Sequence, residues 1–217
     1  MISNLSLALK CPDKNLVYIG NFKVASTYFL YWLETYGWKN IQMSDIDWQV
    51  DHVFSHIMDP MVRRHKGVAE FLNMFELSDK LINDESLFHF LQAPYLDCHS
   101  CPMSIMFKDK VNAIDWIPID IDAIDYYSLT KCLLNKYGVE VKFDREKIHQ
   151  SSQKKLHWYG TVEHHYTDHL QYSDLIPCTF SEDVALYDNV LYNINANGNS
   201  WDDISWINNK LKKEQLS

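Results

Sequence analysis

The chain has 217 residues, of which 47% are hydrophobic and 14% aromatic, so it can bury a large apolar core and is not a disordered protein. Its formal net charge of −9 disfavours a general nucleic-acid-binding protein, which is ordinarily basic. No stretch is apolar for long enough to span a bilayer, and residues 1–16 lack the basic start and apolar run of a secretory signal. We therefore expect a cytoplasmic protein with no membrane partner, and its odd number of cysteines, five, suits free thiols.

The first half of the chain predicts two rounds of a strand followed by a helix. Short apolar runs over residues 16–20 and 51–58 are typical of buried strands. A helix is predicted after each strand, over residues 26–36 and 62–75, and Gly37 is a stop signal for the first helix. The polar stretch between these two units, residues 40–49, predicts a loop.

The second half of the chain predicts three more helices and one more strand. The helices cover residues 78–90, 126–137 and 179–192, and the strand covers residues 103–107. Strands that alternate with helices favour an α/β fold with a mainly parallel sheet. Because no stretch of the chain resembles a linker, we expect residues 1–217 to form one domain.

The segment between the first strand and the first helix contains the residue types that bind an anionic group. It reads Asn21-Phe22-Lys23-Val24-Ala25-Ser26-Thr27. A strand that enters a helix through a tight turn directs several backbone N–H groups at one spot, where the helix dipole adds partial positive charge. Lys23 adds a full charge, and two hydroxyl residues add donors. The nucleotide loop GxxxxGK[ST] is absent, which disfavours an ordinary ATPase or GTPase.

This segment resembles the 5′-phosphosulfate loop of the sulfotransferases, particularly the carbohydrate sulfotransferases, in which a run such as P-K-V-A-S-T follows the first strand. The resemblance implies an α/β, P-loop-like three-layer sandwich with a central, mainly parallel sheet flanked by helices. It also implies the sulfonate donor 3′-phosphoadenosine 5′-phosphosulfate (PAPS), with 3′-phosphoadenosine 5′-phosphate (PAP) as its product. The cofactor-binding residues implied in this loop are Lys23, Val24, Ala25, Ser26 and Thr27. Lys23 would also be catalytic, because it would stabilise the leaving phosphate.

A second stretch resembles the part of these enzymes that binds the 3′-phosphate of the donor, where a strand ends in R-D-P-x-x-R. Asp59, Pro60 and Arg63 match this pattern. Met58 stands where the family has the first arginine, and Lys66 stands where it has a serine. The resemblance therefore implies Arg63 as a ligand of the 3′-phosphate. Arg64 and Lys66 can substitute for the family residues that this chain lacks, since both are cationic and near a helix start.

Weaker resemblances follow later in the chain. Residues 88–90 and 98–102 resemble the H-W and C-H-P-C stretches of the chondroitin-type enzymes, and residues 181–187 resemble a late helix of the family. The pair Cys98-x-x-Cys101 with His99 is also a fragment of a zinc motif, but a four-ligand site needs a second pair. The sequence therefore predicts no bound metal.

The expected reaction is an in-line transfer of the sulfonate to a hydroxyl of a saccharide or another small acceptor. It requires a stabilised leaving group and a base that takes the proton of the acceptor, but no metal. Related enzymes place the base between the two phosphate-binding stretches, which favours His52 or one of the two nearby aspartates. We take His52 as the catalytic base. The full set of candidates is His52, His56, His99, Asp45 and Asp47.

Two other functions stay open on the sequence. A P-loop kinase-like phosphotransferase would need a nucleoside triphosphate and a carboxylate that binds magnesium. A non-catalytic nucleotide-binding module on the same fold is favoured by Met58, where the family has an arginine. The sequence defines no oligomeric state.

Overall fold

The computed structural model describes residues 8–21, 26–75, 84–93, 95–119, 126–142 and 180–196. Within these ranges one sheet is formed by five strands: β1 Ala8–Lys10, β2 Leu16–Ile19, β3 Lys39–Ile41, β4 His52–Ile57 and β5 Ile114–Pro118. The helices are α1 Ser26–Thr35, α2 Pro60–Met74, α3 Asp84–Gln92, α4 Met103–Phe107, α5 Tyr126–Lys136 and α7 Ser181–Ala196. Two short 3₁₀ helices cover Met43–Asp45 (η1) and Lys108–Ala113 (η2).

The sheet is mixed, with a parallel centre and an antiparallel side. Its strand order is β3-β1-β2-β4-β5. Strands β2, β4 and β5 run parallel, with Val17 opposite Val53 and Val53 opposite Ile114. Strand β1 runs antiparallel to both of its neighbours, β2 and β3. The chain therefore has an α/β fold, as predicted from its alternating pattern.

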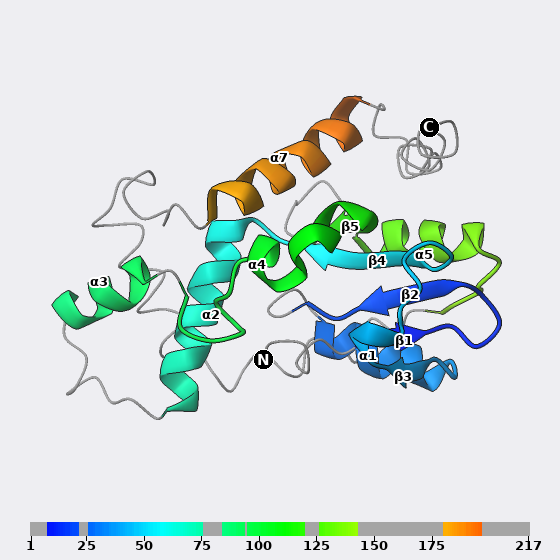
Figure 1. The fold of residues 1–217 in the computed structure, drawn as a ribbon, viewed down its shortest axis with the longest axis horizontal. Helices are drawn as coiled ribbons and strands as arrows, with labels where there is room; N and C mark the ends of the chain where they lie inside the picture. The colour runs from blue at the N-terminus through cyan, green and yellow to red at the C-terminus, as the bar shows by residue number, and fades with distance from the viewer. Residues whose placement is uncertain are drawn as a thin grey trace.

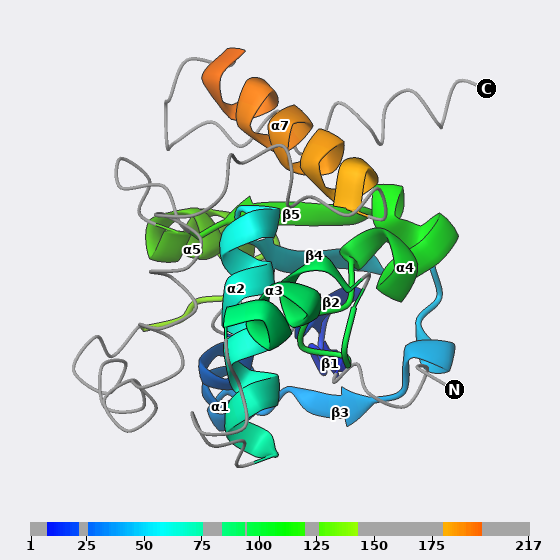
Figure 2. The same cartoon turned by 90° about the vertical axis from the view of Figure 1, so that its left-hand side faces the viewer.

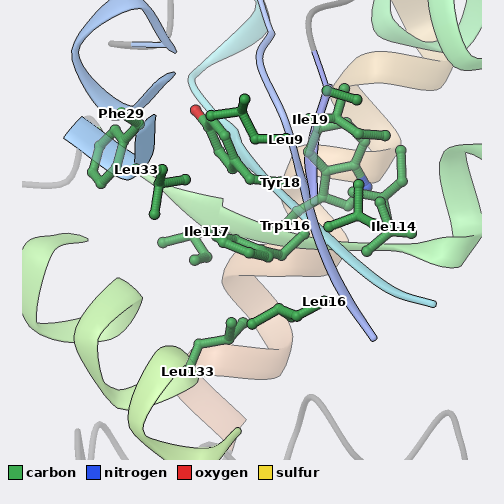
Figure 3. Close-up of a cluster of buried hydrophobic side chains, with 14 of the residues drawn as sticks. Leu9, Leu16, Tyr18, Ile19, Phe29, Leu33, Ile114, Trp116, Ile117 and Leu133 are labelled. Carbon is green, nitrogen blue, oxygen red and sulfur yellow. The ribbon is translucent and has the colours of Figure 1, made fainter. Parts of the chain in front are cut away.

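Helices cover both faces of this sheet. Figure 2 shows α1 and α5 on one face and α4 on the other, while α7 crosses over the β5 side. Figure 3 shows the core between sheet and helices, where Phe29 and Leu33 of α1 approach Tyr18 of β2. The rings of Tyr18 and Phe29 lie 6.0 Å apart, and Leu133 of α5 is fully buried against the same face. Burial of these large side chains stabilises the layered arrangement.

Most of the predicted elements are present with small shifts of their ends. The predicted strands over residues 16–20 and 51–58 are β2 and β4, and the helices that follow them are α1 and α2. Gly37 and Gly138 have positive φ angles of 82° and 69° directly after α1 and α5, as their role as helix stops requires.

The prediction of a strand over residues 103–107 is wrong, because this segment forms α4. The side chain of Asp183 accepts hydrogen bonds from the backbone N–H groups of Met103 (2.6 Å) and Ser104 (2.8 Å), which have no partner inside the helix. The helix start is thus satisfied by a residue far away in the sequence. The strand of this region is β5, whose sequence begins at Ile114.

None of the described helices combines the length and the apolar character that crossing a bilayer would require.

Candidate functional site

The candidate site lies where the parallel strands β2 and β4 end side by side. Tyr18 of β2 pairs with Phe54 of β4, so the segments that follow the two strands emerge next to each other. This carboxyl edge lies toward the left in Figure 1 and faces the viewer in Figure 2. In open α/β sheets the crevice outside the carboxyl ends of the strands is where ligands bind.

Asn21 ties the segment after β2 to the segments around it. The residue is fully buried. Its side-chain nitrogen donates to the backbone carbonyl of His56 at 3.5 Å, and its side-chain oxygen accepts from Nη2 of Arg63 at 3.4 Å. Asn21, the second residue after the end of β2, is therefore fixed on both β4 and α2.

Helix α2 begins at this edge because of the residues after β4. The carboxylate of Asp59 accepts from the backbone N–H groups of Met61 (2.8 Å) and Val62 (3.1 Å), which is the N-cap interaction. Pro60 occupies the first turn, where its missing N–H is not needed and its fixed φ favours the helix. The Asp-Pro pair therefore sets both the start and the direction of α2.

Arg63 joins three segments of the chain at this edge. Its side chain is fully buried, Nη1 donates to the backbone carbonyl of Cys101 at 2.7 Å, and Nη2 reaches Asn21. Burial lowers the pKa of Arg63, and the negative charge of Asp183 opposes this effect. The structure thus shows Arg63 as a residue that positions the loop after β2 against α2 and the segment before α4.

Lys66 brings positive charge to the end of β4. Its ammonium nitrogen lies 3.5 Å from the sulfur of Met58, the buried residue that directly follows β4. Met58 is the position where the resembling enzymes have an arginine. The cation of Lys66, from the second turn of α2, therefore lies against Met58.

The central residues of the predicted loop, Lys23, Val24 and Ala25, lie outside the described residues. The structure does show that α1 begins at Ser26, directly after this loop, and continues through Thr27. The backbone start of α1 therefore stands at the same edge as Asn21.

His52, the predicted base, lies at the opposite edge of the sheet. It is the first residue of β4, a strand of six residues that spans roughly 20 Å. Its Nε2 contacts the carboxylate of Asp115, and its ring stacks on Tyr137 with 4.6 Å between the ring centres. Burial, aided by the charge of Asp115, raises the pKa of Tyr137. The structure does not bring His52 together with Asn21 or Arg63.

The two aspartate candidates also precede β4. Asp45 closes η1, and Asp47 receives no contact from the carboxyl edge; its backbone N–H donates to Asp51 at 3.0 Å. Asp51 in turn pairs with Lys10 at 2.6 Å. These carboxylates therefore stand with His52 at the amino edge of the sheet.

His56 is a core residue. Its ring is fully buried, with Nδ1 3.1 Å from the hydroxyl of Tyr18 and Nε2 3.0 Å from the hydroxyl of Thr130. The ring also stacks on Phe29 with 4.0 Å between centres. Burial lowers the pKa of His56 to about 3, so the imidazole is neutral at ordinary pH. Both ring nitrogens are engaged in holding β2, β4 and α5 together.

His99 lies two residues before Cys101, whose backbone carbonyl accepts from the guanidinium of Arg63. The Nδ1 atom of His99 is 2.8 Å from the carboxylate of Asp97. Burial acts to raise the pKa of Asp97, but hydrogen bonds from His99 and Ser100 outweigh it and leave this pKa below its ordinary value. Sequence reasoning missed Asp97, and its only signal is its spacing of two residues from His99.

The chain matches no family model, no curated protein and no solved structure.

Proposed function

We propose that the protein is a sulfotransferase that uses PAPS and transfers its sulfonate to a hydroxyl of a saccharide or another small acceptor. The observation that supports this most directly is the hydrogen bond between Asn21 and Arg63 at the carboxyl edge. It joins the loop that resembles the 5′-phosphosulfate site to the helix that resembles the 3′-phosphate site. Asn21, the first residue of one stretch, therefore contacts Arg63 of the other, as a shared donor site on a P-loop-like fold would require.

In this proposal the 5′-phosphosulfate group binds at the start of α1. Backbone N–H groups and the partial positive charge of the helix start stabilise the anion there. Lys23 stabilises the charge that develops on the leaving phosphate, while Val24, Ala25, Ser26 and Thr27 form the cradle.

The 3′-phosphate binds near the N-terminal half of α2 through Lys66, which is in the second turn of the helix and lies against Met58. Arg63 contributes by holding Asn21 in place, since its guanidinium is directed to Asn21 and to the carbonyl of Cys101. We leave His52 out of the proposed site because it lies at the amino edge of the sheet.

The proposal is tested by calorimetric titration of the protein with PAP in the absence of metal, with ATP as the competing ligand. We expect PAP to bind without metal and more tightly than ATP. Lys23→Ala and Lys66→Ala should each weaken binding by roughly tenfold or more, since each removes a charge-assisted contact with a phosphate. The matched control is Lys131→Ala, which removes an exposed lysine of α5 and should leave the affinity unchanged.

Other results would favour the kinase-like phosphotransferase or the non-catalytic module. Preference for ATP with magnesium would favour the kinase-like phosphotransferase. Binding of PAP without transfer of sulfonate from PAPS to any of a panel of saccharides would favour the non-catalytic module. Absence of PAP binding would contradict the proposal.

A further inference from the structure

The loop between α3 and α4 is held in one shape by its own hydrogen bonds. One carboxylate oxygen of Asp97 accepts from the backbone N–H groups of His99 (2.9 Å) and Ser100 (3.3 Å). The hydroxyl of Ser100, which is fully buried, accepts from the backbone N–H of Leu96 at 2.8 Å. The backbone that carries residues 97–100 is thus fixed locally, and so are the directions in which its side chains leave it.

The same loop is packed tightly on α2. A Cβ atom added to Gly67 would lie 2.3 Å from the backbone oxygen of His99 and 2.8 Å from the Cα of Ser100. One turn earlier on the helix, Arg63 binds the carbonyl of Cys101. The loop therefore rests on a rigid element, which is what a preorganised ligand site needs.

Three metal-ligating atoms converge on the outer side of this loop. They are a carboxylate oxygen of Asp97, Sγ of Cys98 and Nδ1 of His99, and they all lie within 4.8 Å of one another. All three residues are half-buried, so each is held in place but remains accessible to an ion from solvent.

Their spacing is close to what a tetrahedral metal requires. The distance from Sγ of Cys98 to Nδ1 of His99 is 3.7 Å, compared with about 3.6 Å for a thiolate and an imidazole on one tetrahedral zinc. The distance from Nδ1 to the carboxylate of Asp97 is 2.8 Å, compared with about 3.3 Å on such a metal. Two of the three ligand separations are thus near those of a tetrahedral site, and the hydrogen bond between His99 and Asp97 must lengthen by about half an ångström to admit the ion.

We propose that Asp97, Cys98 and His99 form a binding site for a divalent transition-metal ion of borderline softness, such as Zn²⁺ or Co²⁺. The sulfur and nitrogen ligands exclude Mg²⁺ and Ca²⁺ as natural occupants, because these ions prefer oxygen. Three protein ligands leave the fourth tetrahedral position to water or an external ligand. The site rests on its own residues and goes beyond the proposed sulfonate transfer, which needs no metal.

The proton balance of binding is simple. The thiol of Cys98 releases its proton to solvent when the sulfur binds the ion. Coordination through Nδ1 of His99 requires the lone pair of that nitrogen, so any proton on Nδ1 leaves it when the ion binds. No electron is transferred.

The third ligand explains why the sequence argued against zinc. The C-x-x-C pair alone is incomplete, and the structure directs the sulfur of Cys101 inward, where it lies 3.6 Å from the carbonyl of Pro102. The oxygen of Asp97 takes its place, from a residue outside the C-x-x-C motif.

The test uses the full chain, stripped of metal and kept reduced, titrated with Co²⁺ and followed by absorption spectroscopy. A thiolate bound to Co²⁺ gives a near-ultraviolet charge-transfer band, and we expect this band to saturate at one Co²⁺ per chain. Cys98→Ser should abolish the band. His99→Gln and Asp97→Asn should weaken Co²⁺ binding by roughly tenfold or more, by analogy with the loss of groups that support a metal site.

The controls separate this site from other thiols and from misfolding. None of the four described cysteines, Cys11, Cys98, Cys101 and Cys132, is in a disulfide, so Cys132→Ser provides a matched thiol removal and should keep the band. Far-ultraviolet circular dichroism of each variant should match that of the unchanged protein. Absence of a charge-transfer band, or a band that persists in Cys98→Ser, would overturn the proposal, and zinc titration by calorimetry should rank the same variants in the same order.

Discussion

His56 is the residue whose burial has the clearest consequence for stability. Its pKa in the folded protein is lowered to about 3 by burial, compared with about 6.5 in an unfolded chain. Between these two values the unfolded chain binds a proton that the folded protein does not, so stability falls as the pH is lowered. At pH 7 both states are mostly neutral, and this effect is absent.

We therefore expect the free energy of unfolding to fall on the order of 2 kcal/mol between pH 7 and pH 5 because of His56 alone. The measurement is urea unfolding at both pH values for the unchanged protein and for His56→Gln, which cannot titrate. The variant should lose less stability over this range. His65, whose pKa is also lowered to about 3, by burial and then by Arg64, contributes in the same direction and remains in both proteins.

The control for this prediction is His89→Gln, since His89 is exposed on α3. It should show the same loss of stability between pH 7 and pH 5 as the unchanged protein. Equal losses in His56→Gln and the unchanged protein would mean that His56 takes up its proton without unfolding.

At the scale of single residues, the sequence indicated where the helices begin better than which residues their side chains contact. Helix α1 begins at Ser26, as predicted, and α2 begins at Pro60, two residues before its predicted start, because Asp59 caps it. The engagement of Arg63 with Asn21 and Cys101 depends on segments about forty residues away, as the separations of 42 and 38 show. No local pattern carries that information.

Among the elements, α2 packs tightly on the loop before α4 at Gly67. Gly67→Ala adds a methyl group that must overlap backbone atoms of His99 and Ser100, which cannot turn away as a flexible side chain would. Overpacking of this kind costs about 1–3 kcal/mol, whereas alanine gains about 1 kcal/mol over glycine in a helix interior. The steric cost should prevail.

We expect Gly67→Ala to lower the midpoint of urea unfolding with little change in the slope. Val62→Ala is the matched control, because Val62 is exposed on the same helix, and its effect should stay within about 0.5 kcal/mol. Unchanged or increased stability of Gly67→Ala would show that the loop before α4 moves freely off α2.

The elements that the sequence missed share a physical cause. Residues 103–107 read Met-Ser-Ile-Met-Phe, a run of five that is too short to separate a helix from a strand by its period. Its helical form depends on Asp183, which lies about eighty residues later in the chain. Strands β1 and β3 have three residues each, so only their pairing with each other and with β2 defines them.

For the molecule as a whole, the two edges of the sheet have different chemistry. At the carboxyl edge Arg63 binds Asn21 and Lys66 lies against Met58. The amino edge joins His52 to Asp115 and Lys10 to Asp51. If PAP binds as proposed, it should slow amide hydrogen exchange at residues 26–30 and 61–66. Residues 43–52 should exchange at an unchanged rate.

This prediction is checked by hydrogen exchange with mass spectrometry, with and without PAP. Protection confined to residues 43–52 would place the ligand at the amino edge and return His52 to the site. A protein with Lys23→Ala, measured at the same PAP concentration, should show weaker protection at the carboxyl edge.

The pairing of β5 with β4 also has a consequence for the order in which the chain folds. Strands β1 to β4 lie within the first 57 residues, but the partner that covers the open side of β4 begins only at Ile114. During synthesis the apolar strand β4 is therefore complete well before its neighbour emerges from the ribosome. The unpaired N–H and C=O groups of β4 can then form hydrogen bonds with a strand of another nascent chain. Aggregation of nascent chains must therefore be prevented until β5 is synthesised and pairs with β4.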